Sequence, residues 1–286
     1  MEEVTRKDVK NYYDELRRTP RRGKNRQGEI VFLAHKTAMK RLQFASVMYN
    51  WFIDEEIIKS NPFMRPGITD ETPLEIGDDG ALITERKPFI TRNVFLEVFN
   101  ALPNEEWRTI AVLSRFSAFR CPTEVSQLTW RNINWKDNTM IVVSPKTAYK
   151  RAHIQRTMPM FDEVAEQLER QKKVSKGKFV ISDSLRLKMF DVVDHYGKQK
   201  LTFKNSVIAE EFKRYINNAG YVAWPSPFHS MRASRMTDLL DESVPIHKIS
   251  KWCGASEKVI RAHYTLHHGD DVMLAEKVKS APLMSD

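Results

Sequence analysis

Cysteine is scarce in this chain of 286 residues, which contains only Cys121 and Cys253. Two isolated cysteines exclude a disulfide framework and show no zinc-binding spacing, and we expect both to be reduced. No apolar run approaches the roughly 20 residues that a membrane-spanning helix needs. No basic and then apolar segment opens the chain, so the sequence predicts no secretory signal. Glycine-rich loops that cradle a nucleotide are also missing, which argues against ATP-driven chemistry.

Positive charge, in contrast, is abundant. The formal net charge is +9 and the sequence pI is about 9.4, a balance that favours a polyanionic partner. Residues 1–66 carry 14 Lys and Arg against 9 Asp and Glu, residues 67–85 carry six acidic residues and no basic one, and residues 86–286 carry 32 against 22. Two basic blocks joined by an acidic segment favour two nucleic-acid-binding modules, although solvated Lys and Arg faces alone can produce part of this pattern.

The first 66 residues are predicted to form a small helical, DNA-binding domain. Thr5 is placed to cap a first helix, and a long second helix is predicted from Phe32 to Ile58. A polar loop at 17–26 and the polar edge of the long helix carry the bases that we expect to contact DNA: Arg21, Arg22, Lys24, Arg26, Lys36 and Lys40. The loop bases can equally be solvated. Residues 67–88 have the composition of an acidic linker.

The remaining chain, residues 89–286, is predicted to be a second domain that is mainly helical. Glu105–Phe119 is apolar on both sides, so we expect a central helix there. Pro122 suits the first turn of a helix that would run to about Trp130. Arg120 would then lie just outside a helix N-terminus, where the dipole favours an anion. A solvent-exposed capping Arg is the alternative.

One antiparallel hairpin is expected within the second domain. Met140–Val143 and Ile154–Met160 have the β-branched and apolar content of strands. Lys146 would lie at the tip between them, either as a charge that protects a sheet edge or as a mobile acid that reaches a leaving oxygen. The expected fold class is therefore α+β, mainly α with a small antiparallel β-sheet.

His229 and Arg232 are three residues apart in a predicted helix, so their side chains project from one face. Such a pair can hold two oxygens of one phosphate, with Arg as a bidentate cation and His as a hydrogen-bond donor or proton acceptor. Tyr264 ends a short helix that Ser256 can cap, and its hydroxyl could lie free beside a cleft. Taken singly, the pair can be a surface coincidence and the tyrosine a packing residue.

Four motifs in register resemble the tyrosine recombinase (phage integrase) family over essentially the whole second domain. They are Phe119-Arg120-Cys121-Pro122-Thr123-Glu124-Val125, Ser144-Pro145-Lys146-Thr147, Phe228-His229-Ser230-Met231-Arg232-Ala233-Ser234-Arg235, and Trp252-Cys253-Gly254 through His263-Tyr264. Residues 1–66 are similar to the helical core-binding domain of that family. The resemblance implies a site-specific DNA recombinase, such as the integrase of a mobile element, that works as a homo-tetramer on paired double-stranded DNA sites.

The resemblance also implies a role for each matching residue. Arg120 and Arg232 would clamp the scissile phosphate, and His229 would bond it and manage the proton of the nucleophile. Lys146 would protonate the departing 5′-oxygen, and Tyr264 would attack to leave a 3′-phosphotyrosyl link. This chemistry implies no metal, no ATP and no other cofactor, because two guanidiniums meet the charge and the covalent link conserves the phosphodiester energy.

Three departures from the family pattern stand out. Ala255 occupies a position that the family often fills with His, Trp or Asn, so one donor to the phosphate is missing, naturally or through an introduced change. Glu124 follows Arg120 by four positions where three is usual, and we expect it to support Arg120 or His229. The chain enters the core-binding domain at its second helix and shows no arm-site domain, so we expect a truncated N-terminus.

The C-terminal segment 270–280 has the pattern of a short amphipathic helix. By the resemblance it would pack on a neighbouring subunit, but folding back on its own domain is equally compatible with the sequence. Two functional alternatives remain: a type IB topoisomerase-like nicking and closing enzyme, or a DNA-binding relative with impaired catalysis. The partners expected are specific DNA sites and accessory DNA-bending or directionality factors, in the nucleoid or cytoplasm of a bacterial, phage or archaeal host.

Overall fold

The computed structural model describes residues 4–24, 30–64, 66–68, 88–144, 155–195, 198–203 and 205–264, together with Ala275 and Lys277. The chain divides into two compact units, an N-terminal unit of Met1–Thr84 and a C-terminal unit of Glu85–Asp286. Among the described residues, no helix has the length and apolarity needed to cross a membrane.

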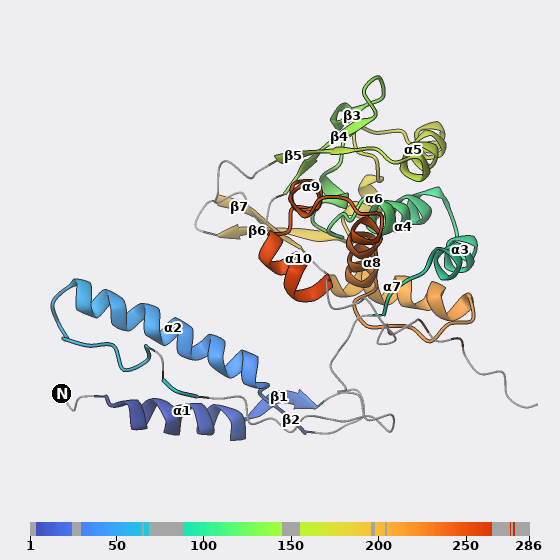
Figure 1. Ribbon diagram of the computed structural model, residues 1–286. Coiled ribbons are helices and arrows are strands. Elements are labelled where there is room, and N and C mark those ends of the chain that lie inside the picture. Colours follow the sequence, from blue (N-terminus) through green and yellow to red (C-terminus); the bar gives the residue numbers. More distant parts are fainter. Residues whose placement is uncertain are drawn as a thin grey trace, which may run out of the picture. The chain divides into compact units, whose positions relative to one another are not determined.

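The N-terminal unit places helix α1 (Arg6–Arg18) antiparallel to helix α2 (His35–Asp54), with strands β1 (Pro20–Lys24) and β2 (Ile30–Phe32) between them in the chain (Figure 1). The predicted cap is present, since the side chains and backbones of Thr5 and Asp8 bond reciprocally as a capping box. The buried apolar side chains described in this unit are Val9, Leu16, Leu33, Ala38 and Leu42. The Tyr13 hydroxyl lies 2.6 Å from His35 Nδ1 and ties the two helices together.

Two expectations for this unit need correction. The long helix spans 35–54 and not 32–58, because residues 30–32 pair as strand β2 with β1. The segment 17–26 is not a loop throughout, since α1 continues to Arg18 and Pro20–Lys24 forms β1. Backbone pairing with the β-branched and aromatic Ile30–Phe32 overrides the polar composition that suggested a loop.

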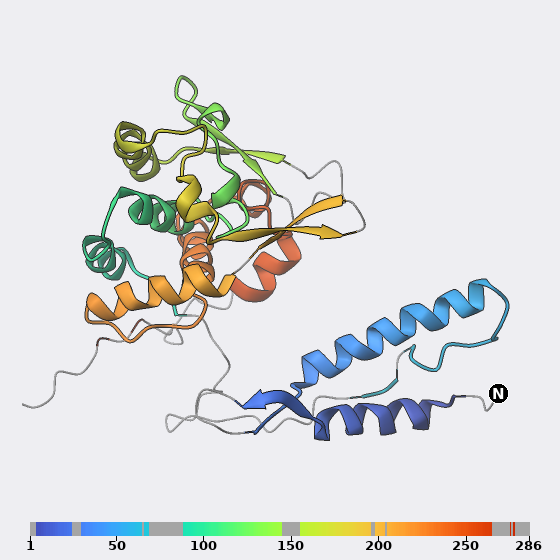
Figure 2. The same cartoon turned by 180° about the vertical axis from the view of Figure 1, so that it is seen from behind.

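The C-terminal unit is mainly α with a small antiparallel sheet, which confirms the predicted fold class (Figures 1 and 2). Its helices are α3 (Arg92–Asn100), α4 (Glu105–Phe116), α5 (Asp162–Val174), α6 (Asp183–Arg186), α7 (Asn205–Asn218), α8 (Pro227–Asp241), α9 (Ile246–Cys253) and α10 (Glu257–Tyr264). Its strands are β3 (Ile133–Asn134), β4 (Thr139–Val143) and β5 (Gln155–Pro159), in the order β3-β4-β5, and a separate hairpin of β6 (Phe190–His195) and β7 (Lys198–Phe203).

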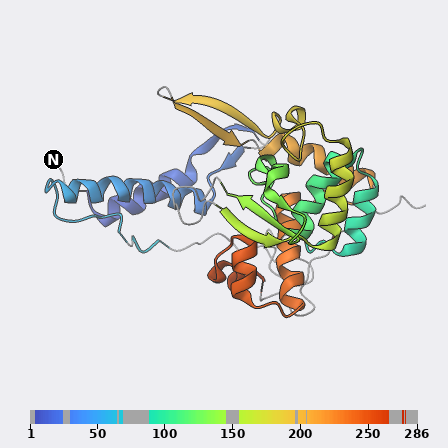
Figure 3. The same ribbon diagram turned by 90° about the horizontal axis from the view of Figure 1, so that it is seen from above.

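Helix α4 is the centre of the unit and packs against α5 and α8 (Figure 3). Asn104 caps it by accepting a hydrogen bond from the Trp107 N–H at 3.1 Å. Trp107 and every residue of Thr109–Phe116 are buried, as expected for a helix that is apolar on both sides. The helix ends at Phe116, three residues earlier than predicted. This core fixes the start of the next segment, which carries Arg120.

The helix predicted from Pro122 to Trp130 does not form. The segment consists of tight turns and the short 3-10 helices Val125–Gln127 and Trp130–Asn132. The amides that would have lain open to an anion are already used: Glu124 N and Ser126 N donate to Arg120 O at 2.7 Å and Pro122 O at 3.0 Å. The carboxylate of Glu124 also accepts the Arg120 N–H at 2.9 Å, which holds the chain in a turn.

Two other segments differ from expectation. Only one hairpin was expected in this mainly helical domain, but residues 190–203 form a second, the β6–β7 hairpin. In the segment 270–280, the described residues Ala275 and Lys277 are not helical, and Lys277 forms an antiparallel bridge with Tyr221 of the same unit. Its ammonium also contacts the Glu97 carboxylate at 2.9 Å, so at this point the chain folds back on its own unit.

Candidate active site

Three residues predicted to act on a phosphate line one cleft of the C-terminal unit. Arg120 comes from the turn that follows α4, whereas His229 and Arg232 come from the first two turns of α8. The cleft has a volume of about 710 Å³, and Phe203 of β7 also lines it. Segments that are far apart in the sequence therefore deliver two guanidiniums and an imidazole to one place.

Helix α8 sets the different depths of His229 and Arg232. Pro227 occupies its first turn, where a missing N–H is not a loss, so the helix begins just before the pair. His229 is exposed, whereas Arg232 is only 5% exposed. The arginine thus lies deep in the cleft while the imidazole lies nearer to solvent.

The buried guanidinium of Arg232 is fixed by two backbone carbonyls. Its Nη1 donates to Ala118 O and its Nη2 to Cys253 O at 2.6 Å. Burial, followed by the positive charge of Arg120, lowers the pKa of Arg232 to about 10, which still leaves it charged at neutral pH. An arginine held in this way keeps its orientation without a bound phosphate.

Arg120 is held by Glu124 and by the end of α9. Its Nη1 donates to Glu124 Oε1 at 2.5 Å, and its Nη2 donates to Gly254 O. Glu124 is 1% exposed, and burial alone would raise its pKa. The hydrogen bonds and charge of Arg156, with the charges of Arg232 and Arg120, outweigh burial and lower the pKa of Glu124 to about 2, so this carboxylate is ionised.

Gly254 is required where it stands for two reasons. Its φ is +63°, a left-handed conformation that ends α9 and that other residues rarely adopt. A Cβ there would lie 3.3 Å from Nη1 of Arg120 and 3.3 Å from Nη1 of Arg156. Glycine therefore lets the end of α9 approach both guanidiniums closely.

Comparison with known families decides what kind of protein this is. The phage integrase family matches residues 93–269, more than half of the chain. The chain belongs to the phage integrase family. Its activity is that of a tyrosine recombinase, as the motifs predicted, and the topoisomerase-like alternative is not favoured. A comparison with curated protein sequences finds no significant match.

Solved structures show the same fold at low sequence identity. The Tn1549 transposon integrase in complex with transposon right end DNA is 16% identical, with a TM-score of 0.62 over 91% of this chain and 81% of the other. A lambda integrase dimer bound to a COC′ core site is 15% identical, with a TM-score of 0.60 over 95% and 83%. XerA recombinase is 13% identical, with a TM-score of 0.50 over 94% and 81%.

The structure does not describe two of the predicted catalytic side chains of this integrase, those of Lys146 and Tyr264. Lys146 lies outside the described residues, in the segment between β4 and β5. Tyr264 is the last residue of α10, and its side chain is outside the described part of the structure. Helix α10 begins after Ser256, whose Oγ accepts the Val259 N–H at 3.3 Å as predicted, and Ile260 anchors the helix in a buried cluster with Cys253.

The other predicted residues occupy surfaces or packing positions. Ala255 packs against the buried cluster that contains Cys253 and Ile260, so it contributes apolar contact and no donor. Lys36 and Lys40 are exposed on α2, and the Lys40 ammonium lies 5.9 Å from the centre of the Phe44 ring. The remaining predicted DNA contacts lie on β1 (Arg21, Arg22 and Lys24) or outside the described residues (Arg26).

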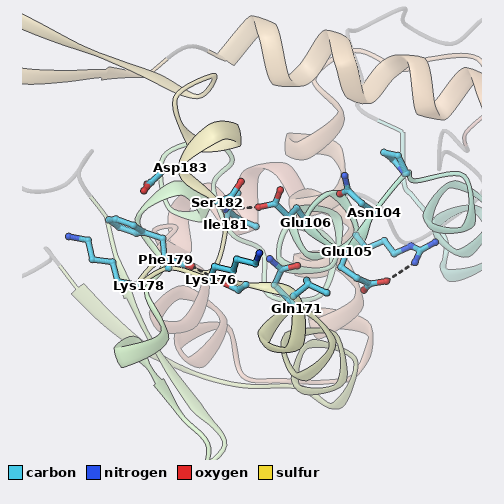
Figure 4. Close-up of a pocket in the computed structure, with 15 residues that line it drawn as sticks. Asn104, Glu105, Glu106, Gln171, Lys176, Lys178, Phe179, Ile181, Ser182 and Asp183 are labelled. Carbon is cyan, nitrogen blue, oxygen red and sulfur yellow. Dashed lines mark hydrogen bonds and ion pairs between the residues drawn. The ribbon is translucent and has the colours of Figure 1, made fainter.

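A second cavity, of about 740 Å³, lies where the start of α4, the end of α5 and segment 175–183 meet (Figure 4). Glu106 closes one side of it by accepting the Ser182 N–H at 2.5 Å. No described residue of the predicted site lines this cavity. Within the described ranges, no group of three or more His, Cys, Asp or Glu side chains could hold a metal ion.

Sequence reasoning missed Arg156, and it gave Ser144 no role although Ser144 begins a motif; both residues bond Glu124. A signal for Arg156 was available, because it lies two residues before Met158 on β5 and therefore shares the face of a buried residue. A charge on the inner face of a strand needs a buried partner, and Glu124 provides it.

Proposed function

We propose that this integrase cleaves and rejoins DNA strands at specific sites through a covalent bond between Tyr264 and a 3′-phosphate. The observation that carries the proposal is the cleft in which Arg120, His229 and Arg232 meet, with both arginines anchored before any phosphate binds. Preorganised donors stabilise developing charge without reorganisation, and removal of one typically costs roughly a hundredfold to a thousandfold in rate.

In this mechanism the Tyr264 oxygen attacks phosphorus while His229 takes or shares the phenolic proton. The P–O bond to the 5′-oxygen breaks, and Lys146 donates the proton that this oxygen needs. Arg120 and Arg232 neutralise the two non-bridging oxygens, whose charge grows in the transition state. Attack by a free 5′-hydroxyl on the phosphotyrosyl bond then reverses the sequence and rejoins the strands without ATP.

Two basic modules would each contact the DNA, with residues 1–66 as a core-binding domain, residues 67–88 as a linker and residues 89–286 as the catalytic domain. The Tn1549 integrase binds transposon right end DNA, and a lambda integrase tetramer is bound to a Holliday junction. By analogy we propose a homo-tetramer on paired sites for integration or excision of a mobile element, with accessory DNA-bending or directionality factors, acting on DNA in the cytoplasm or nucleoid.

A catalytically impaired DNA-binding protein is the second candidate, and Ala255 favours it. The position offers no side-chain donor, so the phosphate would receive one hydrogen bond fewer than the family pattern supplies. Such a protein would bind DNA with the salt dependence of phosphate neutralisation but would form no covalent product.

Covalent trapping separates the two candidates. The protein is incubated in EDTA with duplexes from its element's end, nicked so that the cleaved fragment diffuses away, and is compared with Tyr264→Phe on a denaturing gel. A shifted protein–DNA band that forms only with Tyr264 supports the recombinase. Tight binding without a band would contradict it, and Ala255→His would then test whether the missing donor is the reason.

A further inference from the structure

Arg156 of β5 contacts Glu124, Ser144 and the end of α9, and it uses all three of its guanidinium nitrogens. Its side chain is only 9% exposed. Nη1 donates to Glu124 Oε1 and Nη2 to Glu124 Oε2, both at 2.8 Å, and Nη1 also lies 2.8 Å from Ser144 Oγ. Nε donates to Trp252 O at 2.6 Å. A planar guanidinium is suited to such a fixed set of bonds, which an ammonium cannot reproduce.

The end of α9 binds three arginines in succession. The carbonyl oxygens of Trp252, Cys253 and Gly254 accept hydrogen bonds from Arg156, Arg232 and Arg120 respectively. The last carbonyls of a helix lack partners within the helix and carry its partial negative charge, so they are natural acceptors for cations. One helix end therefore sets the positions of both arginines that line the cleft, and Arg156 holds this end to β5.

Glu124 also connects Arg156 to Arg120, independently of the end of α9. It receives two bonds from Arg156, a 2.5 Å bond from Ser144 Oγ, and bonds from both the backbone and the guanidinium of Arg120. Because Arg156 binds both carboxylate oxygens, Glu124 bonds the Arg120 guanidinium through one nitrogen only. Without Arg156, the carboxylate would be free to draw Arg120 into a two-oxygen ion pair and away from a phosphate.

From these contacts we infer that Arg156 is a positioning residue that fixes Arg120 and Arg232 for phosphate binding through Glu124 and the end of α9. The inference rests on the proposed function. Arg120, Arg156 and Arg232 carry three positive charges against one negative charge on Glu124, so these four side chains have a net charge of +2. That excess matches the two negative charges on the non-bridging oxygens of a pentacovalent phosphorus.

The test compares Arg156→Lys with wild type in single-turnover cleavage of a nicked duplex. Lys keeps the charge but cannot make the four bonds, so we expect cleavage to slow by roughly a hundredfold, the typical effect of one misplaced donor. DNA affinity is expected to stay within about twofold, since phosphate contacts outside the cleft dominate binding. Arg186→Lys is the matched control, because Arg186 is a buried arginine bonded to Ser126 O at 2.7 Å and does not line the cleft.

A second substrate distinguishes positioning from a general loss of structure. A methylphosphonate at the scissile position removes one negative oxygen and with it part of the need for oriented guanidiniums. We expect the defect of Arg156→Lys to shrink at least tenfold on this substrate relative to the phosphodiester. An equal defect on both substrates, or no defect on either, overturns the inference. If Arg156→Lys does not fold, the double variant Glu124→Gln/Arg156→Gln replaces it. This variant removes both charges of the ion pair, and its cleavage rates on the two substrates are compared in the same way.

The controls separate the inference from the proposed function. If wild type forms no covalent band, or Tyr264→Phe forms the same band, the proposed function fails. If wild type forms the band through Tyr264 and Arg156→Lys cleaves at the same rate, only the positioning role fails.

Discussion

The two units of this integrase bury their apolar surface to different extents. In the C-terminal unit, α4 is buried nearly all round, and one continuous cluster extends from Ile90 to Met231. In the described part of the N-terminal unit the buried cluster is small, and α2 leaves large apolar side chains exposed: Phe44 at 66%, Val47 at 63%, Met48 at 51% and Trp51 at 53%. The difference shows where fixed geometry is needed, since buried arginines keep their positions only on a rigid core.

The largest expected effect is the loss of stability when a buried leucine is replaced by alanine, compared between the two units. Leu113 of α4 is fully buried and Leu42 of α2 is 2% exposed. We expect Leu113→Ala to lower the free energy of unfolding of its unit by about 4 kcal/mol and Leu42→Ala by about 2 kcal/mol, because a thin two-helix layer can collapse around a cavity more readily. Urea denaturation followed by circular dichroism measures both. Equal losses would show that the two cores are alike.

A smaller effect on stability is expected from Glu124 and the arginines that bond it, and this effect depends on pH. The pKa of Glu124 is about 2 in the folded chain against 4.5 unperturbed, so its ionised form stabilises the fold above pH 4.5 by about 3 kcal/mol and this contribution disappears as the pH falls towards 2. The stability gap between wild type and Glu124→Gln should therefore narrow between pH 5 and pH 2. Thermal unfolding across this range checks it, and a constant gap would contradict the assignment.

The sequence predicted some elements of the fold and missed others. The helix caps Thr5 and Ser256 were predicted correctly, because a cap is a local signal. The turn after Arg120 was missed, because the Glu124 carboxylate accepts the Arg120 N–H, and the Glu124 and Ser126 amides donate to the carbonyls of Arg120 and Pro122. The β6–β7 hairpin was missed as well, although the β-branched pair Val192-Val193 is a strand signal and the glycine that follows it in the sequence is a turn signal.

The sequence motifs name three residues that line the cleft, but they do not show which residues support them. Arg120, His229 and Arg232 were found because their spacing forms motifs, and the structure brings them to one cleft. Arg156 belongs to no motif. Ser144 and the residues at the end of α9 lie within motifs, but their contacts join positions that only the tertiary fold brings together. Residues of this kind are found from burial and hydrogen bonding and not from spacing.

A still smaller effect is expected from the exposed bases of α2. Replacing Lys36 and Lys40 together with Ala should weaken DNA binding and reduce the salt slope of log Kd by about 2, if each contacts one phosphate. Fluorescence anisotropy at several salt concentrations measures the slope. Lys136→Ala with Lys176→Ala, which are exposed on the other unit and do not line the cleft, serves as a comparison. An unchanged affinity at low salt would remove Lys36 and Lys40 from the interface.

The smallest effect is expected from the exposed apolar residues of the same helix. Trp51→Ser and Val47→Ser should change the free energy of unfolding of the isolated chain by less than about 0.5 kcal/mol, because these side chains are more than half exposed. Urea denaturation is again the measurement. A loss comparable with that of Leu42→Ala would show that they are buried in solution.

The central claim is that Tyr264 attacks a phosphate held in the cleft of Arg120, His229 and Arg232, and its most direct test is to locate the covalent bond. The trapped protein–DNA adduct is digested with protease and nuclease, and the peptide that retains a nucleotide is sequenced by mass spectrometry. The account predicts a 3′-linked nucleotide on Tyr264. A nucleotide on another residue, or a 5′ linkage, would contradict it.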